Sequence, residues 1–321
     1  MRQDDHRGIQ TWIFVTGLPR SGTTFVGRVL SFPLSVDYLH EPFNPSCGIP
    51  ELAQDSLYLR PDDLTNPQAA RYHDTIARML RYEMRFKTVF YPQDARLKRI
   101  AKRFLGGRSN VRLQLTRLNP FHRASVIKDP TAFLLTDFLS HHFGVKPVIV
   151  VRHPVAVVAS WQKLGWQPHL ARWVEQETLA EDYLIDEYAL LTKDWKHPIE
   201  QIAVLWRVAH KVLLRQAARH PSWRLVTHEA LCAEPLRCFR TLYETLHLPW
   251  TTYVKHRIRT WTSLDNPVEA RTGKLHDLRR NSQSLLHLRR EALSPTQRSA
   301  IYDIVAEVAA SFYDRESFGL D

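Results

Sequence analysis

Residues 17–24 (GLPRSGTT) constrain this chain more than any other segment, because they join a short apolar run to a helical pattern. The run spans Trp12 to Val15, and the pattern predicts a helix from Thr23 to about Ser31. In a strand–loop–helix unit, successive backbone N–H groups and the positive end of the helix dipole point into one concavity. The loop therefore predicts a binding site for a phosphate-like anion.

The glycine spacing narrows the kind of anion. Gly17 and Gly22 have the G-x-x-x-x-G spacing of a P-loop, but Thr23 stands where a nucleoside triphosphatase needs Lys. The cation comes earlier, as Arg20, and a guanidinium inside the loop suits a two-point contact with a less highly charged group. This pattern disfavours phosphoryl transfer from ATP. A turn that merely caps the helix is the alternative interpretation.

A second candidate anion site follows the most apolar run, residues 147–151 (PVIVV). Such a run, apolar on both faces, is typical of a central parallel strand. Arg152 comes at its carboxyl end, where open α/β sheets bind ligands, and Ser160 lies about two turns into the helix predicted from Pro154. An Arg and a hydroxyl can both hydrogen-bond one phosphate. A surface Arg and a buried helix Ser are the alternative for this segment alone.

Together the two segments resemble a known family. Residues 19–25 (PRSGTTF) look like the 5′-phosphosulfate loop of sulfotransferases, and Arg152 with Ser160 looks like their 3′-phosphate motif, in the family's order. The resemblance implies an α/β fold, a P-loop-like three-layer sandwich with a central parallel sheet. It also implies 3′-phosphoadenosine 5′-phosphosulfate (PAPS) as co-substrate, with no metal. The donor-binding residues it assigns are Pro19, Arg20, Ser21, Gly22, Thr23, Thr24, Arg152 and Ser160.

Sulfuryl transfer to an alcohol needs a base, and two neighbours compete for that role. Glu41, in residues 38–42 (YLHEP), resembles the Tyr-Leu-x-Glu-Pro of Golgi-type carbohydrate sulfotransferases, and protein-tyrosine sulfotransferases have their catalytic Glu in a comparable place. His40 is the rival. In an extended chain adjacent side chains point to opposite sides, so we expect only one of the two to face the site. A carboxylate base would also need burial that raises its pKa. A purely structural role for Glu41 stays open.

Lys128 is the second predicted catalytic cation, because residues 128–130 (KDP) match the Lys-Asp-Pro of tyrosine sulfotransferases. Its implied role, with Arg20, is to hold the bridging oxygen as the phosphate leaves. Pro130 stands where the cytosolic branch has its catalytic His, and Asp129 is predicted to be a helix N-cap. The late basic segment 271–274 (RTGK) is a loose match to the family's 3′-phosphate loop. To residues 226–231, His228 included, we assign a packing role.

Strand-like runs alternate with helical patterns along the whole chain, which predicts one domain over residues 1–321. We expect strands near 12–15, 36–39, 124–127, 147–151 and 223–226. A helix is expected from Asp129 to Gly144, and longer helices at 172–192, 198–219 and 295–313. Residues 50–110 are predicted to form a helical insertion or cap that builds the acceptor pocket, and 262–290 a long loop.

Composition limits the partners. The chain of 321 residues has a net charge of +11, which favours anionic partners such as nucleotides or anionic sugars. No apolar stretch long enough to span a membrane occurs, no signal peptide is recognised, and three cysteines are typical of a reducing cytoplasm. Neither a metal-binding spacing nor a nucleic-acid module is found.

The expected acceptor is a small alcohol or glycan; the alternative is a non-catalytic protein that binds nucleotides or polyanions. The sequence predicts no oligomeric state.

Overall fold

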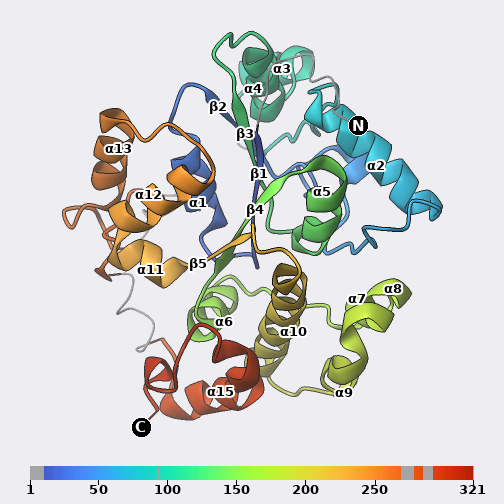
Figure 1. The fold of residues 1–321 in the computed structure, drawn as a ribbon, viewed down its shortest axis with the longest axis vertical. Coiled ribbons are helices and arrows are strands. Elements are labelled where there is room, and N and C mark those ends of the chain that lie inside the picture. The colour runs from blue at the N-terminus through green and yellow to red at the C-terminus, as the bar shows by residue number, and fades with distance from the viewer. Residues whose placement is uncertain (1–10, 93, 269–277, 285–291, 321) are drawn as a thin grey trace. The chain divides into compact units, whose positions relative to one another are not determined.

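Five parallel strands form one sheet at the centre of the fold. The computed structural model describes residues 11–92, 94–268, 278–284 and 292–320. The strands are β1 (Thr11–Thr16), β2 (Val36–His40), β3 (Ala124–Lys128), β4 (Lys146–Val151) and β5 (Arg224–Thr227). Their order is β2-β3-β1-β4-β5, with helices flanking the sheet (Figure 1). The predicted parallel α/β fold is confirmed, and all five strands lie within a residue or two of their predicted positions.

The register of the first three strands aligns their carboxyl ends. β3 pairs in parallel with β1 and with β2, so Lys128 lies opposite Val15 on one side and opposite His40 on the other. All five residues of β3 are buried. Since β3 is covered on both faces and lies between two strands, its last side chain leaves the sheet at a fixed position beside the ends of its neighbours.

The chain divides into two compact units. The first comprises Met1–Thr16 and Val26–Val148, and the second comprises Gly17–Phe25 and Ile149–Asp321. The boundary crosses β4 and the loop after β1 and follows no linker. The single-domain interpretation stays a prediction. In the first unit, Phe14, Ile127 and Phe138 belong to a buried apolar cluster that β1, β3 and the following helices share.

Helices cover most of the remaining described residues. Those of eight residues or more are α1 (Thr23–Leu30), α2 (Pro67–Leu80), α3 (Arg96–Leu105), α4 (Arg108–Arg117), α5 (Thr136–Phe143), α6 (Pro154–Lys163), α10 (Pro198–Ala218), α12 (Pro235–Thr245), α13 (Thr252–Thr262) and α15 (Pro295–Ala309). Shorter ones are η1 (Pro50–Leu52), η2 (Phe133–Leu135), α7 (Ala171–Val174), α8 (Glu177–Leu179), η3 (Ala180–Leu184), η4 (Ile185–Glu187), α9 (Tyr188–Thr192), α11 (His228–Ala233) and η5 (Glu316–Phe318). Among the described residues no helix is long and apolar enough to cross a membrane.

Two helix predictions were wrong in their extent. The helix expected from Asp129 begins only at Thr136, after the 3₁₀ turn η2, although it does end at Gly144. The Asp129 carboxylate accepts from the backbone N–H of Thr131 at 2.9 Å and from that of Phe43 at 2.7 Å, so it organises a turn in place of a helix N-terminus.

The helix expected over 172–192 is a series of short turns, α7 to α9 with η3 and η4 between them. Leu184 ends the π-helical turn η3 and Glu187 ends the 3₁₀ turn η4, and their ψ angles of 2° and −3° depart from the α-helical value of about −42°. The predicted helix over 198–219 is present as α10, which packs against α6 and α15 in the second unit.

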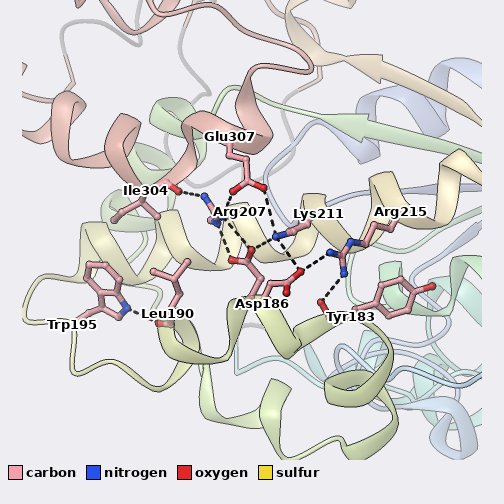
Figure 2. A network of polar contacts seen from close by, with 10 residues as sticks. Tyr183, Asp186, Leu190, Trp195, Arg207, Lys211, Arg215, Ile304 and Glu307 are labelled. Atoms are coloured by element: carbon pink, nitrogen blue, oxygen red, sulfur yellow. Dashed lines mark hydrogen bonds and ion pairs between the residues drawn. The ribbon is translucent and has the colours of Figure 1, made fainter.

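An ion-pair network joins this broken segment to α10. Arg207 donates from Nε to one carboxylate oxygen of Glu187 at 2.8 Å and from Nη2 to the other at 3.2 Å, and Lys211 pairs with the same carboxylate. Both cations also reach Glu307 of α15 (Figure 2). Glu187 is fully buried whereas the Glu307 side chain is 61% exposed. Burial disfavours ionisation of Glu187, but the hydrogen bonds and charges of Arg207 and Lys211 outweigh it and lower its pKa.

The Glu187→Ala variant is expected to lose about 3 kcal/mol of unfolding free energy, because it leaves two largely buried cations, 13% and 15% exposed, without their main partner. Glu307→Ala removes the exposed partner of the same cations, and we expect a loss below about 1 kcal/mol. Urea unfolding followed by circular dichroism measures both. Equal losses in the two variants would show that the buried carboxylate has no special role.

Candidate active site

The loop between β1 and α1 adopts backbone angles that few residues tolerate. Gly17 and Gly22 have φ angles of +138° and +94°, and Arg20 between them has +79°. A Cβ on Gly17 would lie 2.3 Å from the carbonyl oxygen of Val150, and a Cβ on Gly22 would lie 2.5 Å from Cδ2 of His228. Both glycines are thus required by conformation and by space. A non-glycine residue with positive φ is uncommon, and such strained residues cluster at active sites and at segments that hold ligands.

Arg20 joins the two predicted anion-binding motifs within the second unit. Its Nε donates to Oγ of Ser160 at 3.0 Å, and its backbone carbonyl accepts from Nη1 of Arg152 at 2.7 Å. Trp161 holds the same loop, since its indole N–H donates to the carbonyl of Pro19 at 3.0 Å. Arg20, Arg152 and Ser160, which lie up to 140 residues apart in the sequence, therefore form one polar cluster.

The loop also presents hydrogen-bonding groups suited to an anion. Ser21 is fully buried, and its hydroxyl has no hydrogen-bond partner among the described residues. Thr23 and Thr24 open α1, where the first backbone N–H groups of a helix have no acceptor within the helix. A buried hydroxyl without a partner costs free energy unless a ligand or water contacts it. An anion at the start of α1 would satisfy these groups together.

The charges around Arg20 favour the same ligand. Burial and, next, the positive charge of Arg280 lower the pKa of Arg20 below its ordinary value. Two neighbouring cations repel each other, and an anion bound near both would offset this repulsion. Arg280 lies six residues after residues 271–274, the stretch from which we expected a basic contribution. The stretch named for it in the sequence, residues 271–274, lies outside the described residues.

In the first unit, the strand register builds a second polar cluster. Because His40 and Lys128 end neighbouring strands in register, Glu41 comes directly beside Lys128. The Glu41 backbone N–H donates to the Lys128 carbonyl at 2.8 Å, and their side chains form an ion pair. Lys128 is only 2% exposed, so this carboxylate compensates a cation that is almost completely removed from water.

Two conditions considered for Glu41, an extended chain and a raised pKa, are not met. The chain turns at this residue, with φ at +51°, so adjacent side chains do not alternate: His40 Nε2 lies 4.0 Å from Glu41 Oε1. Burial disfavours the ionised form, but the charges of Lys128 and His40 and the hydrogen bonds from Lys128 and Asn44 outweigh it. The pKa of Glu41 is therefore lowered, not raised.

Asp129 follows Lys128 but faces a different environment. It is completely buried, and burial together with the negative charge of Glu41 raises its pKa to about 7. Three donors contact its two oxygens: the backbone N–H groups of Phe43 and Thr131, and the hydroxyl of Thr131 at 2.7 Å. Asp129 therefore does not cap a helix. Its carboxylate connects the segment after β2 to the segment after β3.

Some residues of both clusters were not singled out in the sequence. Asn44 donates from Nδ2 to Glu41 Oε2 at 2.6 Å. The short spacing of three residues was the only sequence feature that could have indicated this contact. Trp161 directly follows Ser160 and contacts the loop that Ser160 contacts. His228 packs against Gly22, as its assigned packing role requires, but no local pattern indicates that neighbour. Arg280 has no distinguishing sequence context.

A parallel α/β sheet with a glycine-containing loop between its first strand and its first helix is the arrangement of a P-loop-like fold. The family model described as the Sulfotransferase family matches residues 13–252, which is well over half of the chain. The chain belongs to this family. The match includes both motifs, both clusters except Arg280, and the helices between β2 and β3.

Several solved structures are similar to this chain. The sulfotransferase domain from the curacin biosynthetic pathway is 17% identical, with 93% of this chain and 97% of that chain covered and a TM-score of 0.46. The sulfotransferase domain of the Synechococcus PCC 7002 olefin synthase is 16% identical, with 97% of each chain covered and a TM-score of 0.44. A mouse sulfotransferase complexed with PAP is 11% identical, with coverages of 96% and 87% and a TM-score of 0.44. No curated protein matches the sequence.

Replacing Gly22 by Ala is expected to destabilise the protein by about 2–4 kcal/mol, since the methyl group would meet the His228 ring and the backbone would be strained. Gly144→Ala is the control: φ there is +61° but nothing lies within 4 Å of the added carbon, so only about 1 kcal/mol is expected. Chemical unfolding of both variants gives the difference. A Gly22→Ala variant no less stable than the control would contradict the close approach of His228.

Proposed function

We propose that this protein transfers the sulfuryl group of PAPS to a hydroxyl acceptor. Membership of the sulfotransferase family supports the class of reaction. The observation that carries the choice of donor is the cluster in which Arg20 contacts both Ser160 and Arg152, beside the buried Ser21 hydroxyl. In this proposal the loop at the start of α1 binds the 5′-phosphosulfate, while Arg152 and Ser160 bind the 3′-phosphate.

The proposed reaction is an in-line displacement at sulfur. Glu41 takes the proton of the acceptor hydroxyl, whose oxygen forms the new S–O bond. The bond between sulfur and the bridging oxygen breaks, and adenosine 3′,5′-bisphosphate leaves with the electron pair. Lys128 and Arg20 stabilise the charge that develops on the bridging oxygen, and no redox change or further reactant is needed.

The lowered pKa of Glu41 has a place in this scheme. A carboxylate paired with Lys128 is ionised and ready to accept a proton, but the same pairing makes it a weak base. If Lys128 turns to the leaving oxygen, Glu41 loses its main stabilising partner and becomes more basic. The ion pair thus supports a sequence in which the cation acts on the donor while the base gains strength.

We assign the acceptor to carbohydrates or other small alcohols, on the resemblance of residues 38–42 to the corresponding segment of carbohydrate sulfotransferases. The helices between β2 and β3 follow directly in the sequence, and we propose that the segment 50–110 contributes the acceptor pocket. Its composition, rich in Arg and Lys, suits an anionic sugar.

Calorimetric titration with adenosine 3′,5′-bisphosphate tests the donor site. Arg152→Ala is expected to weaken binding by about tenfold to a hundredfold, because a charge-assisted hydrogen bond contributes roughly 1.5–3 kcal/mol. Arg237→Ala, in which a 77% exposed side chain is removed from the second unit, is expected to bind as the parent does. Equal affinities for all three proteins would exclude the assigned donor site.

Transfer itself is measured with radiolabelled PAPS and a panel of sugars and alcohols, with sulfated products identified by mass spectrometry. Formation of a sulfate ester together with the bisphosphate is expected. Tight nucleotide binding without transfer to any acceptor would favour the second candidate, a nucleotide-binding protein that retains the loop without the reaction.

The Glu41→Gln variant is expected to keep its affinity for adenosine 3′,5′-bisphosphate and to lose about 10²–10⁴-fold in kcat, because an amide cannot accept the proton. In the parent, kcat/KM is expected to fall only as the pH drops through the Glu41 pKa, which lies below the ordinary 4.5.

His40→Gln is the matched control for the choice of base, since it changes the neighbour and leaves the Glu41–Lys128 pair in place. A large loss of kcat in this variant, with near-parent turnover in Glu41→Gln, would assign the base to His40. Thermal melting of the same samples separates loss of turnover from loss of fold, because Glu41→Gln also leaves Lys128 without its anion.

A further inference from the structure

Helix α3 exposes an apolar face that none of the described residues covers. Leu97, Ile100, Phe104 and Leu105 are 82%, 55%, 81% and 66% exposed, and α3 contains no buried residue. Together with Ala101 they follow the i, i+3, i+4, i+7, i+8 spacing of one helix face. Figure 1 shows α3 beside α4, at the outer end of the strands β2 and β3. A soluble protein seldom leaves four large apolar side chains in a row in water without a partner for them.

The rest of α3 is strongly basic. Arg96, Arg99 and Arg103 lie on one side of the apolar face, and their side chains form no hydrogen bond or ion pair with the part of the chain that the structure describes. Lys98 and Lys102 lie on the other side. The surrounding segment has the same character: residues 84–123 contain eleven Lys and Arg but only one acid, Asp94, and therefore hold +10 of the chain's +11 net charge.

Asp94 and the residues before it hold the helix in this exposed position. Lys98 lies 2.7 Å from one Asp94 oxygen, and Lys102 pairs with the other. Lys102 also donates to the carbonyl of Val89 at 2.8 Å and lies 4.7 Å from the centre of the Tyr91 ring. The helix is thus fastened along its lysine edge, which leaves the apolar face and the arginines accessible.

We propose that α3 binds the surface of an anionic phospholipid membrane, lying parallel to it with Leu97, Ile100, Phe104 and Leu105 in the headgroup–acyl boundary. A short helix with a continuous apolar face, cations along both edges and low overall hydropathy is the pattern of interfacial helices. Charge complementarity favours this occupant: arginines at the edge contact lipid phosphates while their aliphatic stems stay with the apolar face. None of these residues belongs to either polar cluster, and the proposal does not depend on the proposed reaction.

Vesicle co-sedimentation tests the proposal with the full chain. The protein is expected to sediment with vesicles of phosphatidylcholine mixed with phosphatidylserine, to bind vesicles of phosphatidylcholine alone at least about tenfold more weakly, and to be released by high salt. Leu97→Ser combined with Phe104→Ser is expected to reduce binding at least about tenfold, and so is Arg99→Gln combined with Arg103→Gln.

Matched controls change similar residues elsewhere. Ile185→Ser removes an apolar side chain that is 76% exposed in the second unit, and Arg71→Gln combined with Arg78→Gln removes two exposed arginines from α2. Both controls should bind as the parent does. All variants alter exposed positions, so their melting temperatures should match that of the parent.

Three results would overturn the proposal. One is the absence of sedimentation with the phosphatidylserine vesicles. Another is binding that the α3 variants reduce no more than the control variants do. The third is a parent that forms dimers by analytical ultracentrifugation while the Leu97→Ser and Phe104→Ser variant is monomeric and still binds the vesicles, which would make this face an interface between copies of the chain.

Discussion

Lys128 is a cation held almost completely out of water at the end of the most buried strand, and Glu41 is the acid that compensates it. The pairing of β2 with β3 fixes this contact, because the register makes the two strands end together. The Glu41 carboxylate contacts Asn44 and lies near His40, and its charge contributes to the raised pKa of Asp129. A buried pair of this kind is costly to form without good geometry, so the surrounding turn is constrained by it.

The two polar clusters are built differently. Around Arg20, the loop is fixed by backbone conformation and by two contacts to the loop carbonyls, from Arg152 and Trp161. The Ser21 hydroxyl inside it has no partner among the described residues, so the loop has hydrogen-bonding capacity for a ligand. Around Glu41, the hydrogen-bonding capacity is used within the protein. Donor binding therefore suits the first cluster, and a proton acceptor whose strength depends on its partner suits the second.

Much of this arrangement was predictable from the sequence. Strands such as β4 are short, apolar runs bounded by turns, and the Gly17–Gly22 spacing identified the loop. The extent of the helix after Lys128 was missed, because the choice of Asp129 between capping a helix and bridging to Phe43 is decided by a residue 86 positions away. The direction of the Glu41 pKa was not predictable for a similar reason: burial alone would raise it, whereas the pairing with Lys128 that lowers it depends on strand register. The breaks between α7 and α9 were missed as well, and the last of them is at Glu187, whose carboxylate contacts Arg207 of α10, 20 residues further along the chain.

Arg20 and Glu41 share a backbone conformation that lowers the stability of the protein. Each has a positive φ angle, a conformation that costs a residue with a Cβ on the order of 1 kcal/mol. Glycine or asparagine would occupy the same backbone more comfortably. Laboratory selection for heat resistance alone is therefore expected to replace Arg20, and with it the guanidinium in the loop. It is expected to keep Glu41, because the buried Lys128 would lose its anion and that cost exceeds the strain.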